Sequence, residues 1–188
     1  MEQVTVIHGS RTVLLNGEIN DDTAASVCKA LLELEAEDSS SHITLMINSG
    51  GGSVSAGWMI IDTLRLIDTV ETICIGQACS MAALILAAGK KGCRSILPHS
   101  KVMIHQPLAS AAMQQAADFE IAFHELGRTK SELYQFLANA TGKSYAQIEA
   151  DCDRNYWLSS TEAVEYGLVD FVETPATRTG GIYPAGNV

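Results

Sequence analysis

Basic residues are scarce in this sequence: 12 Lys and Arg stand against 22 Asp and Glu, which gives a formal net charge of −10 at pH 7. Nucleic-acid binding needs patches of Lys and Arg that neutralise phosphates, so the composition argues against a nucleic-acid partner. Anionic membrane surfaces are disfavoured for the same reason. The longest weakly polar stretch, Met81–Gly89, is far shorter than the roughly 20 residues of a membrane-spanning helix. Acidic Glu2 and the lack of an apolar segment behind it argue against a secretory signal, and we expect a cytoplasmic protein.

Cysteines are few and have no paired spacing. There are five, an odd number, and no two show a CxxC spacing, so we expect buried reduced thiols rather than a disulfide framework or a zinc site. No two histidines and a carboxylate have the spacing of metal ligands, so no metal site is expected.

With 188 residues, 47% of them hydrophobic and only 18% charged, the chain is long and apolar enough for one domain with a real core. We expect that domain over residues 1–172, a loosely ordered tail over 173–188, and further burial in an oligomer.

Hydrophobic periodicity divides the chain into alternating strands and helices. The predicted strands are Thr12–Leu15, ended by Asn16-Gly17, then His42–Asn48, Glu71–Gln77, Lys101–His105 and Leu168–Val172. The predicted helices run from a cap at Asp21 or Asp22 to about Ala36, from Val54 onward, over Ser80–Ala88 with Gly89 as the stop, and over about 116–140 with Gly142 just beyond. Two shorter helices are expected after the capping boxes Ser144-x-x-Gln147 and Ser159-x-x-Glu162.

The strand–helix alternation over residues 42–105 predicts right-handed βαβ crossovers and therefore an α/β fold with a mostly parallel sheet. Binding sites in such sheets form at the carboxyl ends of the strands. Three polar segments fall at such ends: Gly50–Gly52, Ala78–Met81 and Ile104–Gln106. We therefore expect the functional site to combine these three segments.

Ser80 lies between a predicted strand and an apolar helix, with small residues around it: Ala78, Ala82 and Ala83. A nucleophilic serine needs such a sharp turn, because the unbonded amides at the start of a helix can hold an oxyanion. The motif differs from the G-x-S-x-G elbow, so an N-cap or a small core residue is the alternative interpretation.

His105 ends a β-branched and apolar strand before the turn at Gln106-Pro107. A neutral imidazole near pH 7 suits a general base that accepts the serine proton. The alternative is an ordinary histidine at the end of a strand. The other four histidines, His8, His42, His99 and His124, have no comparable setting.

The Gly50–Gly52 run has several interpretations. Glycines let the backbone approach a ligand closely and adopt positive φ. The Walker pattern and the G-x-G-x-x-G pattern are both absent, so phosphate binding is weakly supported. An amide donor for an oxyanion, an edge that pairs with an extended peptide, and a plain strand-to-helix turn fit equally well.

Together these segments resemble the ClpP family of self-compartmentalising serine proteases, from about Val13 to Val172. The motifs that carry the resemblance are Ile47–Val54, Gly76–Met81, Val102–Pro107, Leu158-Ser159 and Glu162–Asp170. The resemblance implies the crotonase-like ClpP fold, a βαβ spiral with a protruding long helix. It also implies ATP-dependent proteolysis in protein quality control, with the ATP used by a ring-shaped ATPase partner and no cofactor in this chain.

The resemblance implies a role for each site residue. Ser80 matches the nucleophile, His105 the general base, and the amides of Gly52 and Met81 the oxyanion hole. Gly50 and Gly51 would hold the peptide as an added strand. Two heptameric rings would stack through the helix at about 116–140 into a tetradecamer that encloses unfolded proteins or short peptides.

Asn155 departs from the family pattern, because an Asp occupies the matching position before the aromatic-Leu-Ser segment. Asn can accept the imidazole hydrogen bond but brings no charge, so we expect a slow Ser-His-Asn triad, with Asp153 as a substitute acid if the loop shifts. Arg154 matches an arginine that takes part in the ring–ring contact. The loss of the acid at position 155 would weaken this contact. Further departures are Gly50 in place of Pro, the short Met1–Gly9 segment, and Thr44, Met46 and Leu66 in place of rim aromatics.

These departures leave two hypotheses open. The first is a Clp-type serine endopeptidase of low intrinsic activity, as a homomeric particle or mixed with a standard paralogue. The second is a catalytically weak or inactive structural subunit of a mixed ring. A crotonase-type acyl-CoA enzyme is the least favoured alternative, because only Lys90, Lys91 and Arg94 cluster for the CoA phosphates.

Overall fold

The computed structural model describes residues 3–108 and 115–174. The strands are β1 (Val4–Ile7), β2 (Thr12–Ile19), β3 (Ile43–Gly52), β4 (Val70–Cys79), β5 (Arg94–Ile96), β6 (Lys101–Ile104), β7 (Tyr156–Ser159) and β8 (Phe171–Val172). The helices are α1 (Asp21–Glu37), α2 (Val54–Arg65), α3 (Met81–Ala88), α4 (Ala116–Thr141), α5 (Tyr145–Asp151) and α6 (Ser160–Tyr166), with a short 3-10 helix at His8–Ser10.

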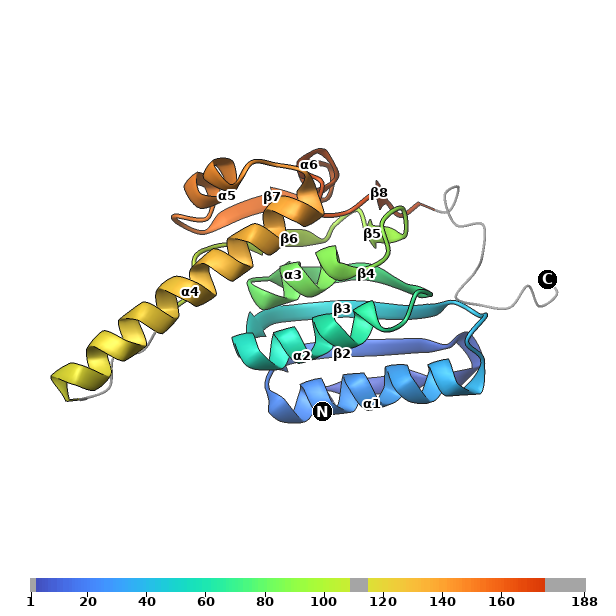
Figure 1. Ribbon diagram of the computed structural model, residues 1–188. Helices are drawn as coiled ribbons and strands as arrows, with labels where there is room; N and C mark the ends of the chain where they lie inside the picture. Colours follow the sequence, from blue (N-terminus) through green and yellow to red (C-terminus); the bar gives the residue numbers. More distant parts are fainter. Residues whose placement is uncertain (1–2, 109–114, 175–188) are drawn as a thin grey trace.

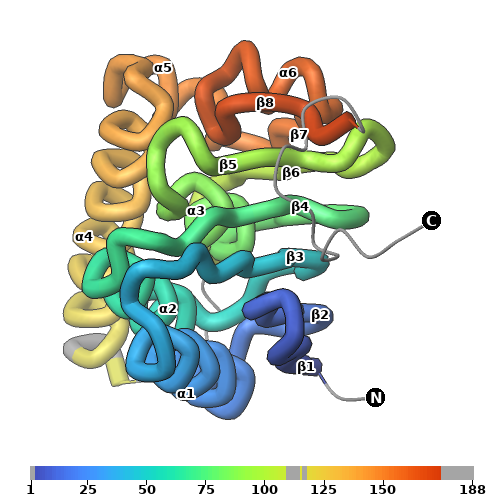
Figure 2. Tube along the Cα trace, turned by 90° about the vertical axis from the view of Figure 1, so that its right-hand side faces the viewer, coloured from blue at the N-terminus to red at the C-terminus, as the bar shows by residue number. Residues whose placement is uncertain are grey.

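The strands form one sheet that is mostly parallel, as the alternation of strands and helices predicts. The order β1-β2-β3-β4-β5-β8 contains only one antiparallel pair, β1 with β2. Helices α1, α2 and α3 cover one face of this sheet, as Figures 1 and 2 show. The core between them is built from aliphatic side chains with essentially no exposure, among them Leu15, Leu31, Leu45, Ile60 and Ile85. The α/β class and the ClpP-type arrangement of mostly parallel strands and helices are therefore confirmed.

Strand β4 pairs with two different strands beyond β3. Its residues Thr72–Cys74 run parallel to β5, and its residues Gln77–Cys79 run parallel to β6. Strand β6 in turn pairs with β7 in the antiparallel direction. The last residues of β4, which lead directly to Ser80, are thus held between β3 and β6.

Several predicted strand bounds were wrong: β4 runs two residues further than expected, to Cys79, and β8 begins only at Phe171 instead of Leu168. The two largest differences lie at glycines. Asn16-Gly17 does not end β2, because the strand continues to Ile19 with a register shift between Asn16 and Glu18. Gly17 has a φ of +115°, a value that suits glycine, so this residue accommodates the irregularity. The glycine run is likewise the end of β3 rather than a plain turn, since β3 extends to Gly52.

The predicted helix caps were partly right. Asn20, not Asp21 or Asp22, caps α1 and forms a capping box with Thr23. The box between Ser159 and Glu162 is confirmed. At the start of α5 only half a box forms: Ser144 accepts from the Gln147 amide, but the Gln147 side chain bonds to Asp151 instead.

Three short strands were not predicted. β1, β5 and β7 have only four, three and four residues, too few to show a clear alternation of apolar and polar positions. Their formation depends on pairing with distant segments. The most consequential omission is β7, because Asn155 directly precedes it.

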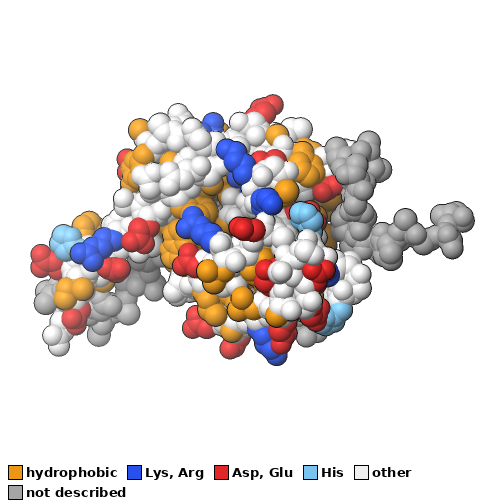
Figure 3. Space-filling view, turned by 45° about the vertical axis from the view of Figure 1, so that its right-hand side comes forward, with side chains coloured by type: hydrophobic (Ala, Val, Ile, Leu, Met, Phe, Trp, Pro, Cys, Tyr) orange, Lys and Arg blue, Asp and Glu red, His pale blue; other side chains and the backbone are white. Residues whose placement is uncertain are grey.

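Helix α4 confirms the predicted long helix and projects from the body (Figure 1). Its C-terminal half packs through Leu133, Tyr134 and Leu137, and it ends at Gly142, whose φ is +79°. Its N-terminal half exposes Phe119, Ile121 and Phe123. Hydrophobic side chains also gather on the projecting part of the molecule and where it joins the body in Figure 3.

Arg94, the first residue of β5, and Asp170, which directly precedes β8, form a largely buried ion pair between these neighbouring strands. The Arg94 guanidinium donates from Nε to Asp170 Oδ2 at 3.0 Å and from Nη2 to Oδ1 at 2.7 Å. A further nitrogen of Arg94 donates to the Ala87 and Ala140 carbonyls near the ends of α3 and α4. Burial raises the pKa of Asp170, but the hydrogen bonds from Arg94 and the Gly92 amide lower it more, so the net change is downward.

The five cysteines carry free thiols; Cys28, Cys74, Cys79 and Cys152 are buried, and Cys93 is half-buried.

Over the described ranges, no helix has the length and hydropathy needed to cross a membrane. Most of the predicted loose tail, residues 175–188, lies outside the described residues, so its state and the single-domain boundary at 172 stay predictions.

Candidate active site

Ser80 is the single residue between β4 and α3. Its backbone has φ +55° and ψ −126°, and within the described ranges only Arg11 is another non-glycine residue with positive φ. Such a conformation stores strain of roughly 1–3 kcal/mol and is typical of functional positions. The Ser80 amide donates to the Met103 carbonyl at 2.8 Å, so β6 helps to hold this turn. The sharp strand-to-helix turn inferred from the sequence is therefore present.

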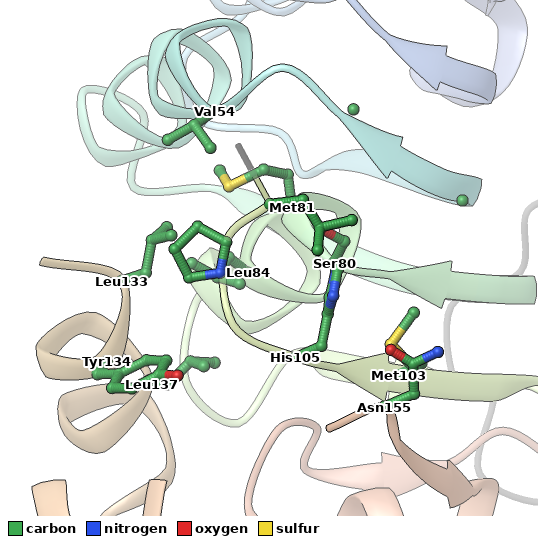
Figure 4. Close-up of a pocket in the computed structure, with 14 residues that line it drawn as sticks. Val54, Ser80, Met81, Leu84, Met103, His105, Leu133, Tyr134, Leu137 and Asn155 are labelled. Atoms are coloured by element: carbon green, nitrogen blue, oxygen red, sulfur yellow. The ribbon is translucent and has the colours of Figure 1, made fainter. Parts of the chain in front are cut away.

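A cavity of about 430 Å³ opens beside Ser80 and is called the Ser80 cavity here. It brings together all three segments that the sequence placed at strand ends. The lining residues are Gly50, Gly52, Val54, Ser80, Met81, Leu84, Met103, His105, Pro107, Leu108, Leu133, Tyr134, Leu137 and Asn155. Most of the wall is apolar (Figure 4), and a large apolar side chain fits in a cavity of this volume.

His105 follows β6 and is half-buried. Its ring extends toward Ser80 in Figure 4. Burial lowers the pKa of His105 below its ordinary value of 6.5, so the imidazole is neutral at pH 7. A neutral imidazole aimed at the serine is the form that a general base requires.

Met81 and Gly52 are the two residues whose amides are predicted to hold an oxyanion. Met81 is the first residue of α3, and amides in the first turn of a helix have no acceptor within the helix. Gly52 has a φ of +155°, and a Cβ added there would lie 2.1 Å from the Ile19 carbonyl oxygen. Both residues line the Ser80 cavity, but their action on an oxyanion stays a prediction.

Gly50 and Gly51 differ in what they can offer a peptide. The Gly51 amide already donates to Ser49 Oγ at 3.0 Å, and a Cβ on Gly51 would come within 2.7 Å of Ser80 Cβ. Gly50 lines the Ser80 cavity and has open space around it, since a Cβ there would meet only Gln77 Nε2 at 4.0 Å. The predicted peptide-binding edge is therefore crowded at one glycine and open at the other.

Asn155 is placed by the antiparallel pairing of β6 with β7. The register pairs Ile104 with Tyr156, so one further step sets Asn155 opposite His105. In Figure 4, Asn155 lies on the side of His105 away from Ser80. Within the described part of the chain, the side chains of Ser80, His105 and Asn155 make no hydrogen bond. The three predicted residues therefore meet in one cavity without forming a closed triad.

A second cavity of about 440 Å³, called the Asp153 cavity here, lies on the other side of His105. It is lined by His105, Gln106, Leu108, Asp153, Arg154 and Asn155. Arg154 is 90% exposed and lies 3.8 Å from the Asp153 carboxylate. This exposure leaves Arg154 available for the predicted contact between rings, which stays a prediction.

The sequence did not reveal the walls that α4 contributes to the Ser80 cavity. Leu133, Tyr134 and Leu137 follow the i, i+3, i+4 spacing of a helix, which indicates a buried face but not the part of the protein against which that face packs.

Within the described ranges, no three His, Cys, Asp or Glu side chains lie close enough to hold a metal ion.

Comparisons with known proteins agree with this geometry. The model of the Clp protease family matches residues 1–176. The chain is 48% identical over 171 residues to the ATP-dependent Clp protease proteolytic subunit 2 of Prochlorococcus marinus (strain NATL2A), which covers 90% of this chain and 86% of that protein. It is 50% identical over 163 residues to the proteolytic subunit 3 of Synechococcus sp. (strain CC9605), with 86% and 82% covered.

The chain belongs to the Clp protease family. The role that goes with this family is that of a proteolytic subunit, a serine protease that works as a ring oligomer with a Clp ATPase. Family membership also disfavours the acyl-CoA alternative.

Proposed function

We propose that this chain hydrolyses peptide bonds through Ser80 and His105, with Asn155 in place of the usual triad acid, at a low intrinsic rate. The observation that carries the proposal is the strained Ser80 turn, which opens into the same cavity as His105 and the start of α3. In a trypsin-like triad, replacing the acid by Asn lowers kcat about 10⁴-fold, which sets the scale of the expected loss.

In the proposed reaction, Ser80 Oγ attacks the carbonyl carbon of the scissile amide while His105 takes the hydroxyl proton. The carbonyl electron pair moves onto oxygen, where the amides of Gly52 and Met81 stabilise the negative charge. The imidazolium then gives its proton to the leaving nitrogen, the C–N bond breaks, and an acyl-enzyme remains. Water, activated by His105, releases the second product by the same steps.

The proposed particle is a cytoplasmic double ring of seven subunits each, which takes unfolded proteins from an ATPase or short peptides by diffusion. The exposed apolar side chains on α4 and the exposed Arg154 support contact between two rings. The Gly50–Gly51 edge would hold the peptide backbone through strand pairing. Leu66, at one of the rim positions, is 78% exposed and apolar but not aromatic, which supports an altered docking face.

A second candidate is a structural subunit of a mixed ring with little or no activity. It is favoured by the open arrangement of His105 and Asn155, whose side chains do not hydrogen-bond within the described residues. An imidazole without a fixed tautomer and without a nearby charge is a poor general base.

The two candidates are separated by intact-mass analysis after treatment with a fluorophosphonate. The first predicts a single adduct that disappears in Ser80→Ala, because only an activated serine reacts rapidly. An absent adduct in assembled material supports the structural subunit. The labelling is then repeated with a standard Clp partner ring present, which tests activation by the partner.

A further inference from the structure

We infer that the hydroxyl of Tyr134 selects the substrate side chain that enters the Ser80 cavity and favours a neutral hydrogen-bond acceptor, such as the carboxamide of glutamine. Tyr134 is a specificity-determining residue in this inference, because it contacts the side chain of the substrate and not the reacting atoms. The inference rests on the proposed function, since it names the class of side chain that the Ser80 cavity takes.

Tyr134 is the polar group of the cavity wall that the proposed reaction does not use. The polar side chains that line the Ser80 cavity are Ser80, His105, Asn155 and Tyr134, and the first three are assigned to the chemistry. Tyr134 stands on α4 between two leucines of the same wall. In Figure 4 its ring extends from α4, with the hydroxyl directed away from that helix. Single polar groups in a mostly apolar pocket are the ones that orient a ligand and give specificity.

The Tyr134 hydroxyl is buried and unpaired. The residue is 1% exposed, and its oxygen has no hydrogen-bond partner among the described residues. An unpaired buried hydroxyl costs free energy, because it has given up its bonds to water without replacement. A substrate side chain that supplies an acceptor recovers this loss, whereas an apolar side chain does not. Since the hydroxyl is already desolvated by folding, binding costs only the desolvation of the substrate's own acceptor.

Neighbouring side chains fix the orientation of the Tyr134 ring before a substrate arrives. Tyr145 packs against it edge to face, with 5.9 Å between the ring centroids, and the Lys130 ammonium lies 5.3 Å from the Tyr134 centroid. Other parts of the cavity wall are adaptable, because Met81 and Met103 have unbranched side chains that repack readily. The adjustment that lets a substrate group reach the buried hydroxyl is assigned to these methionines.

The charges around Tyr134 favour a neutral acceptor over a carboxylate. Burial raises the pKa of Tyr134, and Cys152 and Glu149 are the neighbouring groups that raise it most thereafter. The phenol therefore keeps its proton at pH 7 and can donate a hydrogen bond. The Glu149 carboxylate and the net charge of −10 oppose a further negative charge in the cavity. A glutamine side chain offers a neutral carbonyl oxygen at about the length of methionine, whereas glutamate would bring a charge that is costly to bury.

The test compares Tyr134→Phe with Tyr145→Phe as the matched control. Each variant removes one hydroxyl from the same aromatic pair, and Tyr145 is not among the described residues that line the Ser80 cavity. The readout is kcat/KM of assembled particles for peptides that differ only in the residue before the scissile bond, which is Gln, Met or Glu. The Gln-to-Met ratio should fall about fivefold to tenfold in Tyr134→Phe and stay the same in Tyr145→Phe. The wild-type chain should prefer Gln to Glu by at least about tenfold.

Urea unfolding separates this role from a structural one. Because the hydroxyl has no partner in the protein, its removal in Tyr134→Phe should not lower the free energy of unfolding. An unchanged Gln-to-Met ratio in Tyr134→Phe overturns the inference, and so does an equal change of this ratio in Tyr145→Phe. Cleavage of the Glu peptide as fast as the Gln peptide overturns the assignment of a neutral acceptor.

A binding measurement keeps the inference testable without turnover. Isothermal titration calorimetry of Ser80→Ala particles, with and without Tyr134→Phe, compares peptides that end in Gln or in Met. The same fall in the Gln-to-Met ratio is expected for the association constants. If the wild-type chain neither hydrolyses peptides nor reacts with the fluorophosphonate, the proposed function fails, while the calorimetric ratio still decides whether Tyr134 selects the side chain.

Discussion

Gly51 packs directly against Ser80, and a Cβ on Gly51 would lie 2.7 Å from both Ser80 Cβ and the Cys79 carbonyl oxygen. Gly51 also has a φ of +95°, which side chains rarely adopt. The position of the serine therefore depends on the absence of a side chain on the neighbouring strand.

Gly51→Ala should displace Ser80 and abolish labelling by the fluorophosphonate. Strain at positive φ together with the clash should also lower the free energy of unfolding by about 1–3 kcal/mol. Gly50→Ala is the matched control, because its Cβ would meet only Gln77 Nε2 at 4.0 Å. Labelling and urea unfolding of both variants check this prediction, and equal labelling of the two would contradict it.

Asn155→Asp should raise kcat at least about tenfold, with the 10⁴-fold effect known for a trypsin-like triad as the upper limit. The physical reason is that a carboxylate stabilises the imidazolium that forms when His105 accepts the Ser80 proton. Peptidase assays should be paired with native mass spectrometry, so that only assembled particles are compared. No increase in assembled material would mean that position 155 does not limit the reaction.

The pH profile should report the protonation of His105. Because burial lowers its pKa below 6.5, kcat/KM of the wild-type chain should persist to a pH below 6.5 before the base is protonated. Asn155→Asp adds a negative charge, which favours the imidazolium and raises the pKa of His105. The acid limb of the profile should therefore move to higher pH in this variant. A shift in the opposite direction would exclude contact between position 155 and His105.

The buried ion pair of Arg94 and Asp170 should be important for stability. Arg94→Met removes the guanidinium from the half-buried Asp170 carboxylate and leaves only the backbone amides of Gly92 and residue 94 as donors. Breaking a buried pair of this kind lowers the free energy of unfolding by about 3–5 kcal/mol. Lys29→Met is the control, because Lys29 and Glu33 form an exposed pair.

The same ion pair should make stability depend on pH. Since the pKa of Asp170 lies below its ordinary value of 3.8, its contribution to the free energy of unfolding is present above pH 3.8 and is lost as the pH falls below that value. Urea titrations at neutral pH and at a pH below 3.8 measure both effects, and an Arg94→Met loss no larger than the control's would refute the prediction.

Phe123→Ser should weaken the stacking of rings without changing the stability of the subunit. Phe123 is 65% exposed on the projecting half of α4, so its apolar surface is available to a second copy. Leu66→Ser is the control, since Leu66 is 78% exposed at the end of α2. Sedimentation velocity should show smaller particles only for Phe123→Ser. Smaller particles for neither variant would argue against α4 as the contact.

The sequence predicts those parts of the site that depend on local structure. Ser80 and His105 each follow a strand with a recognisable apolar pattern, and this pattern alone places both residues at the same edge of the sheet. Met81 follows from the start of the helix. The role of Gly52 came from the resemblance to the family, and the structure adds that no side chain fits there.

The parts that were not predicted depend on contacts between distant segments. The register that sets Asn155 opposite His105 arises from β6 and β7, which are far apart in the sequence, as the pairing of Ile104 with Tyr156 shows. The four residues of β7, Tyr156–Ser159, show no clear alternation, and only resemblance to the family pointed to Asn155. The apolar wall from α4 was equally hidden, because a helical pattern gives the buried face but not the neighbour.

The attachment of β7 has a consequence for how this protein evolves. Gly52 ends β3, and Ser80 and His105 directly follow β4 and β6, whereas Asn155 directly precedes β7, which among the described strands pairs with β6 alone. Changes at position 155 therefore leave the packing around the nucleophile intact. Mutation at this one position can therefore adjust the catalytic strength of a subunit while the fold that holds the nucleophile is kept.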